Sequence, residues 1–492
     1  MKMFFGHPNG MQAIPSRIAT RASRCTGSNL RFFSNAYRHV LTALSLVACV
    51  SLGAHAADGT GGNRTFGDSV GLGVKFIQGQ SLDTLPMLKD LKVKWAREHV
   101  NWRDIETSPG AYGALPANLR RQLAYYREND IGLVGILTLS RTETAPTSPE
   151  EIAVGSDAEA FGRFAAKVAQ LLKAEGVRFV LEVGNEPHNS HLVKALGGQW
   201  NGRPPSPWLD HYVQMVNAAV RNVKAYDPSV KVLAGDDMWV VDYWMLEAGL
   251  DPRLDGLTVH PYARGIPEIA AVANDTDWVR PFVAVDADRS LQSGVKRLRA
   301  AALQKFGRPV EIWITEMGWP VAEGERAVDN ATPERTVASY IPRSFILAAE
   351  AGVEGFCWFS SQDAVDGPMG LTRNDWSRRL TYSAFRTMTE QLGDLKFVHR
   401  LQGEKGTDAA VQAFLFANRD RSVVVAWNAR GTEDMQFVLP QYRPNDLAVV
   451  DLVGNRRMVP ARNRRFSIPI NGEPVYIQLF SRSEWASAFR IK

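Results

Sequence analysis

Between residues 66 and 395 the chain alternates short, continuous apolar runs with longer segments whose apolar residues recur every three or four positions. Continuous apolar runs predict strands buried on both faces, as in a parallel sheet. The pattern at 157–175 predicts a helix that ends at Gly176. The apolar runs cover residues 70–76, 93–97, 132–137, 179–183, 232–234, 256–259, 310–315 and 355–359. Eight strand–helix units over about 330 residues are typical of a (β/α)8 TIM barrel in the α/β class.

An open, doubly wound sheet is the alternative architecture. It usually carries a glycine-rich phosphate turn, and Gly71-Leu72-Gly73 lacks the third glycine of that turn. From residue 396 the pattern changes to short β-rich runs separated by turns, at 411–416, 423–427, 435–439, 447–452, 466–470 and 475–480. We therefore expect a barrel domain at 66–395 and a small antiparallel β-sandwich domain at 396–492.

The first 56 residues differ from the rest of the chain. They hold six basic side chains and no acidic one, and an apolar run at 40–52 leads to Ala54-His55-Ala56. Because about 20 apolar residues are needed to span a bilayer, this run predicts a signal peptide at 1–56 that is cleaved after Ala56. A lipoprotein signal at Cys49 and an uncut anchor remain alternatives. We expect a linker at 57–65 and an exported, periplasmic or secreted, protein.

Composition removes several classes of function. The net charge of +5 originates in the leader, because residues 57–492 carry 51 basic against 52 acidic side chains. The folded part thus has no basic excess that would indicate nucleic acid as a partner. Beyond the leader Cys357 is the single cysteine, so no intramolecular disulfide can form. Its apolar surroundings predict a buried thiol.

Acidic, basic and aromatic residues follow the predicted strands. Barrel enzymes place catalytic side chains at the carboxyl ends of their strands, so these residues should share one rim. The candidates, in strand order, are Arg97, Asn185, Glu186, His260, Tyr262, Glu316, Trp319 and Trp358. Asp236 and Asp237 also follow a strand, although such a position is more typical of helix caps.

Two of these residues, Glu186 and Glu316, are the pair that retaining glycoside hydrolysis requires. One carboxyl must be protonated to donate to the leaving oxygen, and the other must be ionised to attack the anomeric carbon about 5–5.5 Å away. We assign Glu186 as acid/base and Glu316 as nucleophile. Arg97 could keep Glu316 ionised, and Tyr262 could donate a hydrogen bond to it. Asn185 could bind a sugar hydroxyl, and Trp358 could present its ring to a sugar face.

The motifs Gly184-Asn185-Glu186-Pro187 and Trp313-Ile314-Thr315-Glu316-Met317-Gly318-Trp319 resemble those of the clan A (β/α)8 retaining glycoside hydrolases. That clan carries its two glutamates at the ends of strands 4 and 7. Arg97, His260-Pro261-Tyr262 and Trp358 match its strand 2, 6 and 8 positions. The chain resembles family 39-like or family 5-like members, which include endoglycosidases associated with bacterial exopolysaccharide. The strand 3 end, Leu137–Ser140, departs from the pattern because it offers neither histidine nor an aromatic ring.

The resemblance implies endo-cleavage of a β-linked polysaccharide without a cofactor. Two alternatives stay open, namely an exo-acting β-glycosidase of the xylosidase or iduronidase kind and a non-catalytic carbohydrate-binding protein. The long segment 188–208 should shape the cleft, and Trp200, Trp239 and Trp319 could be platforms for sugars. His188-x-x-His191 lacks the glutamate of a zinc helix motif, so we expect no metal. The oligomeric state is left open.

Overall fold

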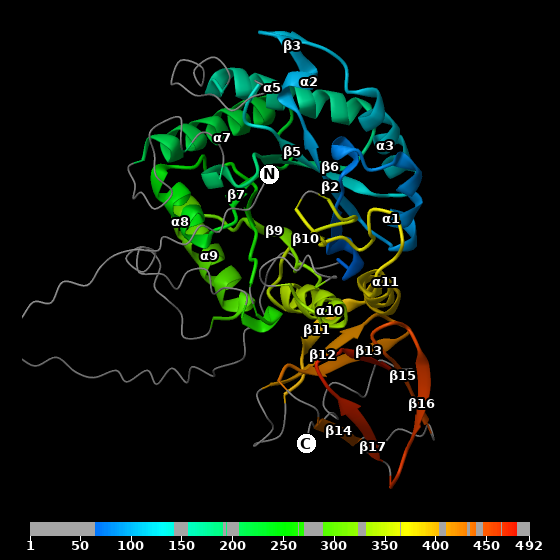
Figure 1. Ribbon diagram of the computed structural model, residues 1–492. Helices are drawn as coiled ribbons and strands as arrows, with labels where there is room; N and C mark the ends of the chain where they lie inside the picture. Colours follow the sequence, from blue (N-terminus) through cyan, green and yellow to red (C-terminus); the bar gives the residue numbers. More distant parts are fainter. Residues whose placement is uncertain are drawn as a thin grey trace, which may run out of the picture. The chain divides into compact units, whose positions relative to one another are not determined.

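The computed structural model describes residues 64–141, 156–189, 193, 206–263, 265–269, 289–322, 331–364, 366–402, 410–430, 433–438, 446–463 and 465–479. In them, eight parallel strands close into a barrel in the order β1-β10-β9-β8-β7-β6-β5-β2 (Figure 1). They are β1 (Val70–Gly73), β2 (Trp95–Val100), β5 (Gly132–Leu137), β6 (Phe179–Val183), β7 (Val232–Asp236), β8 (Gly256–Val259), β9 (Glu311–Met317) and β10 (Gly355–Trp358). Each strand overlaps one predicted apolar run, so the predicted TIM barrel is confirmed.

At least one helix follows each strand of the barrel. These helices are α1 (Pro86–Asp90), α2 (Trp102–Ile105), α3 (Ala117–Glu128), α5 (Ala158–Ala174), α7 (Pro207–Tyr226), α8 (Trp239–Ala248), α9 (Leu291–Phe306), α10 (Glu334–Glu350) and α11 (Leu380–Leu392). Helix α5 confirms the helix predicted for 157–175. Asp157 caps its first turn, because its side chain accepts the Ala160 N–H at 2.6 Å. None of the helices in the described ranges is long and apolar enough to cross a membrane.

The barrel interior is layered. A first layer is apolar and consists of Trp95, Val134, Val180, Leu233, Trp313 and Cys357. Side chains on a strand alternate between the two faces, so the next inward residue lies two positions further along. On β2, β6 and β9 these next residues are Arg97, Glu182 and Thr315, and all three are buried. The polar layer of the barrel therefore lies directly on the apolar layer, toward the carboxyl ends of the strands.

Strand β9 contains an irregularity that changes this alternation. Ile314 pairs with Phe356 and Met317 pairs with Trp358, so three steps along β9 match two steps along β10. This is the register of a β-bulge, which re-aims the side chains beside it. Thr315 and Glu316 are neighbours in sequence, and both contact the polar layer as a result. Glu316 thus lies within β9, rather than after it as the sequence predicted.

Beyond the barrel lie two antiparallel sheets. A six-stranded sheet has the order β11-β12-β13-β18-β15-β16, and β14 pairs with β17 in a second sheet. The strands are β11 (Lys396–Arg400), β12 (Val411–Ala417), β13 (Ser422–Asn428), β14 (Glu433–Val438), β15 (Asp446–Val450), β16 (Arg456–Pro460), β17 (Arg465–Ile470) and β18 (Val475–Leu479). Residues of both sheets share one apolar cluster, as in a sandwich. The sequence analysis missed β11 and β16.

The six-stranded sheet also contributes to the barrel's core. Phe414, Phe416 and Trp427 belong to the same buried cluster as the residues of the barrel helices. The Trp427 Nε1–H donates to Glu268 Oε1 at 2.7 Å, and Glu268 is paired with Arg343 of α10. Apolar burial and a charged contact therefore both join the sheet to the barrel.

Candidate active site

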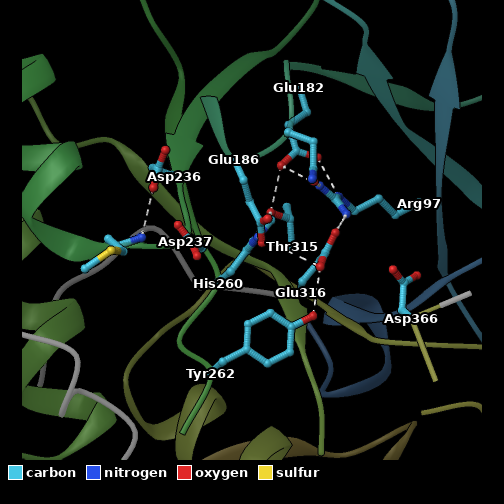
Figure 2. Close-up of polar contacts among 12 residues, drawn as sticks. Arg97, Glu182, Glu186, Asp236, Asp237, His260, Tyr262, Thr315, Glu316 and Asp366 are labelled. Carbon is cyan, nitrogen blue, oxygen red and sulfur yellow. Dashed lines mark hydrogen bonds and ion pairs between the residues drawn. The ribbon is translucent and has the colours of Figure 1, made fainter. Parts of the chain in front are cut away.

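Glu316 of β9 is held by direct contacts to both carboxylate oxygens (Figure 2). Arg97 Nη1 donates to Oε1 at 2.5 Å, and the Tyr262 hydroxyl donates to Oε2 at 2.8 Å. Burial opposes the ionised form of this carboxyl. The charges of His260 and Arg97 and the hydrogen bonds from Tyr262 and Arg97 outweigh that effect and lower the pKa of Glu316 to about 2. Glu316 is therefore a carboxylate across the physiological range of pH.

Arg97 is fixed from its other side by Glu182 of β6. The Arg97 Nε donates to Glu182 Oε2 at 2.6 Å and Nη2 donates to Glu182 Oε1 at 3.2 Å, while Nη2 also donates to Asn185 Oδ1 at 2.7 Å. Arg97 and Glu182 are both at least 96% buried. The sequence analysis missed Glu182, although one signal was present, since it is the single charged residue in the apolar run 179–183.

Glu186 lies in the turn after β6. Gly184 and Glu186 both have left-handed backbone, with φ of +73° and +46°, which is uncommon for a residue other than glycine. Glu186 Oε1 lies 3.0 Å from His260 Nδ1. Backbone geometry and His260 together therefore place this carboxyl.

The proton positions around His260 follow from its partners. The Thr315 hydroxyl donates its single proton to Glu182 at 2.7 Å, so it must accept the Nε2–H of His260 at 3.0 Å. Nδ1 then faces Glu186, either as an acceptor from a protonated carboxyl or as a donor to a carboxylate. Burial lowers the pKa of His260, but Glu316 and Glu186 outweigh it, and the net direction is upward. His260 and Glu186 can thus share a proton.

The two glutamates are close together. Glu186, Glu316 and His260 each offer a ligand atom, and these three atoms lie within 4.8 Å of one another. Retaining glycosidases hold their two carboxyl groups about 5–5.5 Å apart and inverting ones about 6.5–9.5 Å apart, so oxygens this close favour the retaining arrangement. The same three atoms could ligate a cation, but the Arg97 guanidinium already places a positive charge at Glu316.

A second polar cluster lies behind Glu186 and consists of His188, Asp236 and Asp237. His188 Nδ1 lies 2.6 Å from Asp236 Oδ1 and 2.9 Å from Asp237 Oδ1. Asp236 also accepts the backbone N–H of His188 at 3.2 Å and that of Met238 at 3.1 Å. Burial opposes charge here, but the two carboxylates raise the pKa of His188 to about 11. The three residues could hold a metal ion. Asp236 is not the cap of helix α8, whose N-cap is Met238 without a side-chain cap, and its two backbone hydrogen bonds join the turn after β6 to the end of β7.

The predicted aromatic platforms need correction. Trp239, Trp319 and Trp358 have only 1–2% of their surface exposed, because they pack in the core rather than on the rim. Trp319 stacks on Trp358 with 5.9 Å between ring centroids and donates to the Gly265 carbonyl at 3.0 Å. These rings have almost no face left for a sugar.

Several other predictions fall outside the described residues. They concern the leader 1–56 with Cys49, most of the linker 57–65, Trp200 and His191. Cys357 lies inside the described residues and is buried as predicted, and burial raises the pKa of its thiol to about 12.

Comparison with solved structures identifies the fold. A family 39 glycoside hydrolase from Bacteroides cellulosilyticus WH2 aligns with a TM-score of 0.65 and 16% identity, over 85% of this chain and 82% of that chain. The chain has the fold of the clan A glycoside hydrolases. Two further structures have this fold. A glucosidase from Croceicoccus marinus aligns with a TM-score of 0.57 and 12% identity, over 85% of this chain and 96% of that chain. The family 86 β-porphyranase BpGH86A from Bacteroides plebeius aligns with a TM-score of 0.55 and 14% identity, over 85% of this chain and 74% of that chain. No family model and no curated relative matches the sequence.

Proposed function

We propose that this protein is a retaining glycoside hydrolase with Glu316 as nucleophile and Glu186 as acid/base. The observation that carries the proposal is the pair of carboxyls with oxygens within 4.8 Å, one of them held ionised by Arg97 and Tyr262. A sugar-binding protein would gain nothing from an ionised carboxylate at that distance from a second carboxyl. The fold supports the same reaction class.

The contacts give each residue a part in the two displacement steps. In the first, Glu316 attacks the anomeric carbon while protonated Glu186 donates to the leaving oxygen, and a glycosyl ester forms on Glu316. In the second, Glu186 takes a proton from water, and the resulting hydroxide displaces Glu316. His260 supports both states of Glu186, because its Nδ1 can accept or donate at 3.0 Å. Asn185 engages Arg97 through Oδ1, which leaves its Nδ2 donors for a sugar hydroxyl.

We further propose that the substrate is a β-linked polysaccharide, that cleavage is internal, and that bacterial exopolysaccharide is the natural target of the exported enzyme. The leader sequence supports export. Motif resemblance to exopolysaccharide-associated endoglycosidases and fold similarity to a β-porphyranase support the substrate class. Fold similarity to a glucosidase is the observation that favours the exo-acting alternative.

The test is release of new reducing ends from purified bacterial exopolysaccharides and plant β-glycans. Wild type, Glu316→Gln and the exposed control Glu159→Gln are compared, and product sizes are recorded. We expect oligosaccharides from wild type and control and none from Glu316→Gln. Monosaccharide products would establish the exo-acting alternative. Cleavage by Glu316→Gln at the wild-type rate would overturn the proposed function, and glycan retention without cleavage would favour a binding protein.

A further inference from the structure

Lys75 and Asp366 form an ion pair that is connected to the candidate active site through the Phe359 and Tyr262 rings. Lys75 follows β1 and Asp366 lies in the loop after β10, and Nζ is 3.0 Å from Asp366 Oδ2. In the view of Figure 2, Asp366 lies on the side of Glu316 that faces away from Glu186. Lys75 is 8% exposed and the Asp366 side chain 20% exposed, so the pair is sheltered but reachable.

The loop that carries Lys75 is fixed by neighbouring elements. Gln80 Oε1 accepts the Lys75 N–H at 2.8 Å and the Ser361 hydroxyl at 2.8 Å. Glu98 of β2 accepts the Ile77 N–H at 3.1 Å from the next turn of the same loop. These contacts hold the lysine before any ligand arrives, and a preorganised group loses little entropy on binding.

Both members of the ion pair have hydrogen-bonding capacity left. Within the described residues, Lys75 Nζ hydrogen-bonds to Asp366 Oδ2 and lies 4.1 Å from the centre of the Phe359 ring. An ammonium has three donors, so two N–H groups remain, and the second oxygen of Asp366 remains as an acceptor. Phe359 also contacts the ring of Tyr262, which donates to Glu316. Two ring contacts therefore connect the ion pair to the residue that holds the nucleophile.

The proposed mechanism decides which part of the substrate meets this pair. The leaving oxygen must lie against Glu186 and the anomeric carbon must lie over Glu316. The ring that becomes attached to Glu316 then extends away from Glu186, toward Asp366. We propose that Lys75 and Asp366 bind adjacent hydroxyls of this ring and select a neutral sugar over a uronic acid. The inference rests on the proposed function and adds the class of sugar.

Charge and the numbers of hydrogen-bond donors and acceptors favour hydroxyls over a carboxylate. A hydroxyl can accept from Lys75 and donate to Asp366 at once, and a vicinal pair can use the donors and the acceptor together. A carboxylate only accepts, so it would leave Asp366 without a donor and would place two negative charges side by side. Because Asp366 already neutralises Lys75, the pair offers no net positive charge to a uronate.

Covalent labelling with activated 2-deoxy-2-fluoro-β-glycosides tests the inference, because these compounds trap the glycosyl ester on the nucleophile. The probes are the 2,4-dinitrophenyl glycosides of glucose, galactose and mannose and the matching glucuronide. We expect the best neutral probe to label wild type at least about ten-fold faster than the glucuronide. Asp366→Asn and Lys75→Met should slow that labelling roughly ten- to hundred-fold, since each loses a hydrogen bond to a charged group.

The matched control is Asp130→Asn, which makes the same change in the ion pair with Lys94 at the opposite end of β2. It should label like wild type. Lys75→Met removes the charge from an unbranched side chain and provides the test if Asp366→Asn does not fold. A glucuronide that labels Glu316 faster, or variants that label like wild type, would overturn this inference and leave the proposed function standing. Absence of label on Glu316 with every probe would contradict both.

Discussion

Glu316 and Glu186 stand on β9 and in the turn after β6, and the protein positions them by different means. Glu316 is gripped by charged and hydroxyl donors on both oxygens. Glu186 is placed by a left-handed backbone in a turn that Asp236 ties down through the His188 N–H. The first residue is thus controlled through permanent charge, and the second through its backbone together with His260, which can share a proton with it.

The difference matches what each carboxyl must do. A nucleophile has to stay ionised, so permanent positive charge beside it is an advantage. An acid/base has to hold a proton and later take one up, so a fixed cation beside it would favour one of its two states. A backbone constraint fixes geometry without fixing charge. The five substitutions below test this contrast, in order of decreasing effect.

Replacing the two glutamates separately should have the largest effect. Glu316→Gln removes the attacking group, so turnover of every substrate should fall by roughly 10⁴-fold or more. Glu186→Gln should cost about 10²–10⁴-fold on substrates with poor leaving groups and little in the first step on 2,4-dinitrophenyl glycosides, which need little protonation. Steady-state rates across a series of aryl leaving groups check this. Equal losses across the series for Glu186→Gln would contradict its role as acid.

Glu182→Gln should weaken the hold on Arg97, the residue that keeps Glu316 ionised. Arg97 would lose one of its two buried carboxylate partners and keep Glu316, so the cost should approach from below the value of about 3–5 kcal/mol for a broken buried ion pair. Urea unfolding measures this loss. Glu159→Gln is the control, because it breaks an exposed pair with Arg221, which is worth about 0–1 kcal/mol. Equal stability of the two variants would show that Glu316 alone is a sufficient counter-charge for Arg97.

Tyr262→Phe should shift the pH profile. A carboxyl with a lowered pKa stays charged above that pKa, so Glu316 loses its charge only as the pH falls toward about 2. Without the Tyr262 hydrogen bond the pKa rises, and activity should be lost at a higher pH on the acid side. A shift of roughly one pH unit in the acid limb of kcat/KM corresponds to the weakest such bonds to a charged group. An unchanged acid limb with lower kcat would assign Tyr262 to substrate contact instead.

Asp236→Asn should loosen the backbone control of Glu186. The expected loss is about ten-fold on poor leaving groups, since small misplacements of a catalytic group reduce rates by such factors. Substrates with good leaving groups should lose much less, because they depend little on Glu186. The comparison uses the same aryl series, with Asp130→Asn as control and a melting temperature for each variant. Equal losses for all leaving groups would show that Asp236 supports the fold in general.

The sequence predicted the barrel, and a group of polar residues at one end of it, for one physical reason. Strands buried on both faces are continuous apolar runs, and catalytic groups follow directly at their ends. Arg97, Glu186, His260, Tyr262 and Glu316 were found in this way, and the structure brings them together. The bulge in β9 that turns Glu316 inward leaves no comparable trace in the pattern.

The misses also have physical causes. Strands β11 and β16 lie at the two edges of the six-stranded sheet, where charged residues such as Lys396 and Arg456 interrupt the apolar alternation. Lys75 and Asp366 are 291 positions apart, and only barrel closure brings them together. Tryptophans were predicted as sugar-binding platforms because large rings near a rim can stack on sugars. Their size equally favours burial in the core, where Trp239 and Trp358 lie.

The core shared by barrel and sheet has a consequence for modularity. A module that moves between proteins must carry its own interior, whereas Phe414, Phe416 and Trp427 complete the interior of the barrel. A chain that ends after residue 395 would expose the apolar barrel surface that these three rings cover. Its area would be roughly 500 Å², and soluble monomers rarely expose an apolar patch of that size. Residue 396 therefore marks a change in secondary-structure pattern and not a boundary between independent folding units. The barrel and the sheets should unfold together in a single transition.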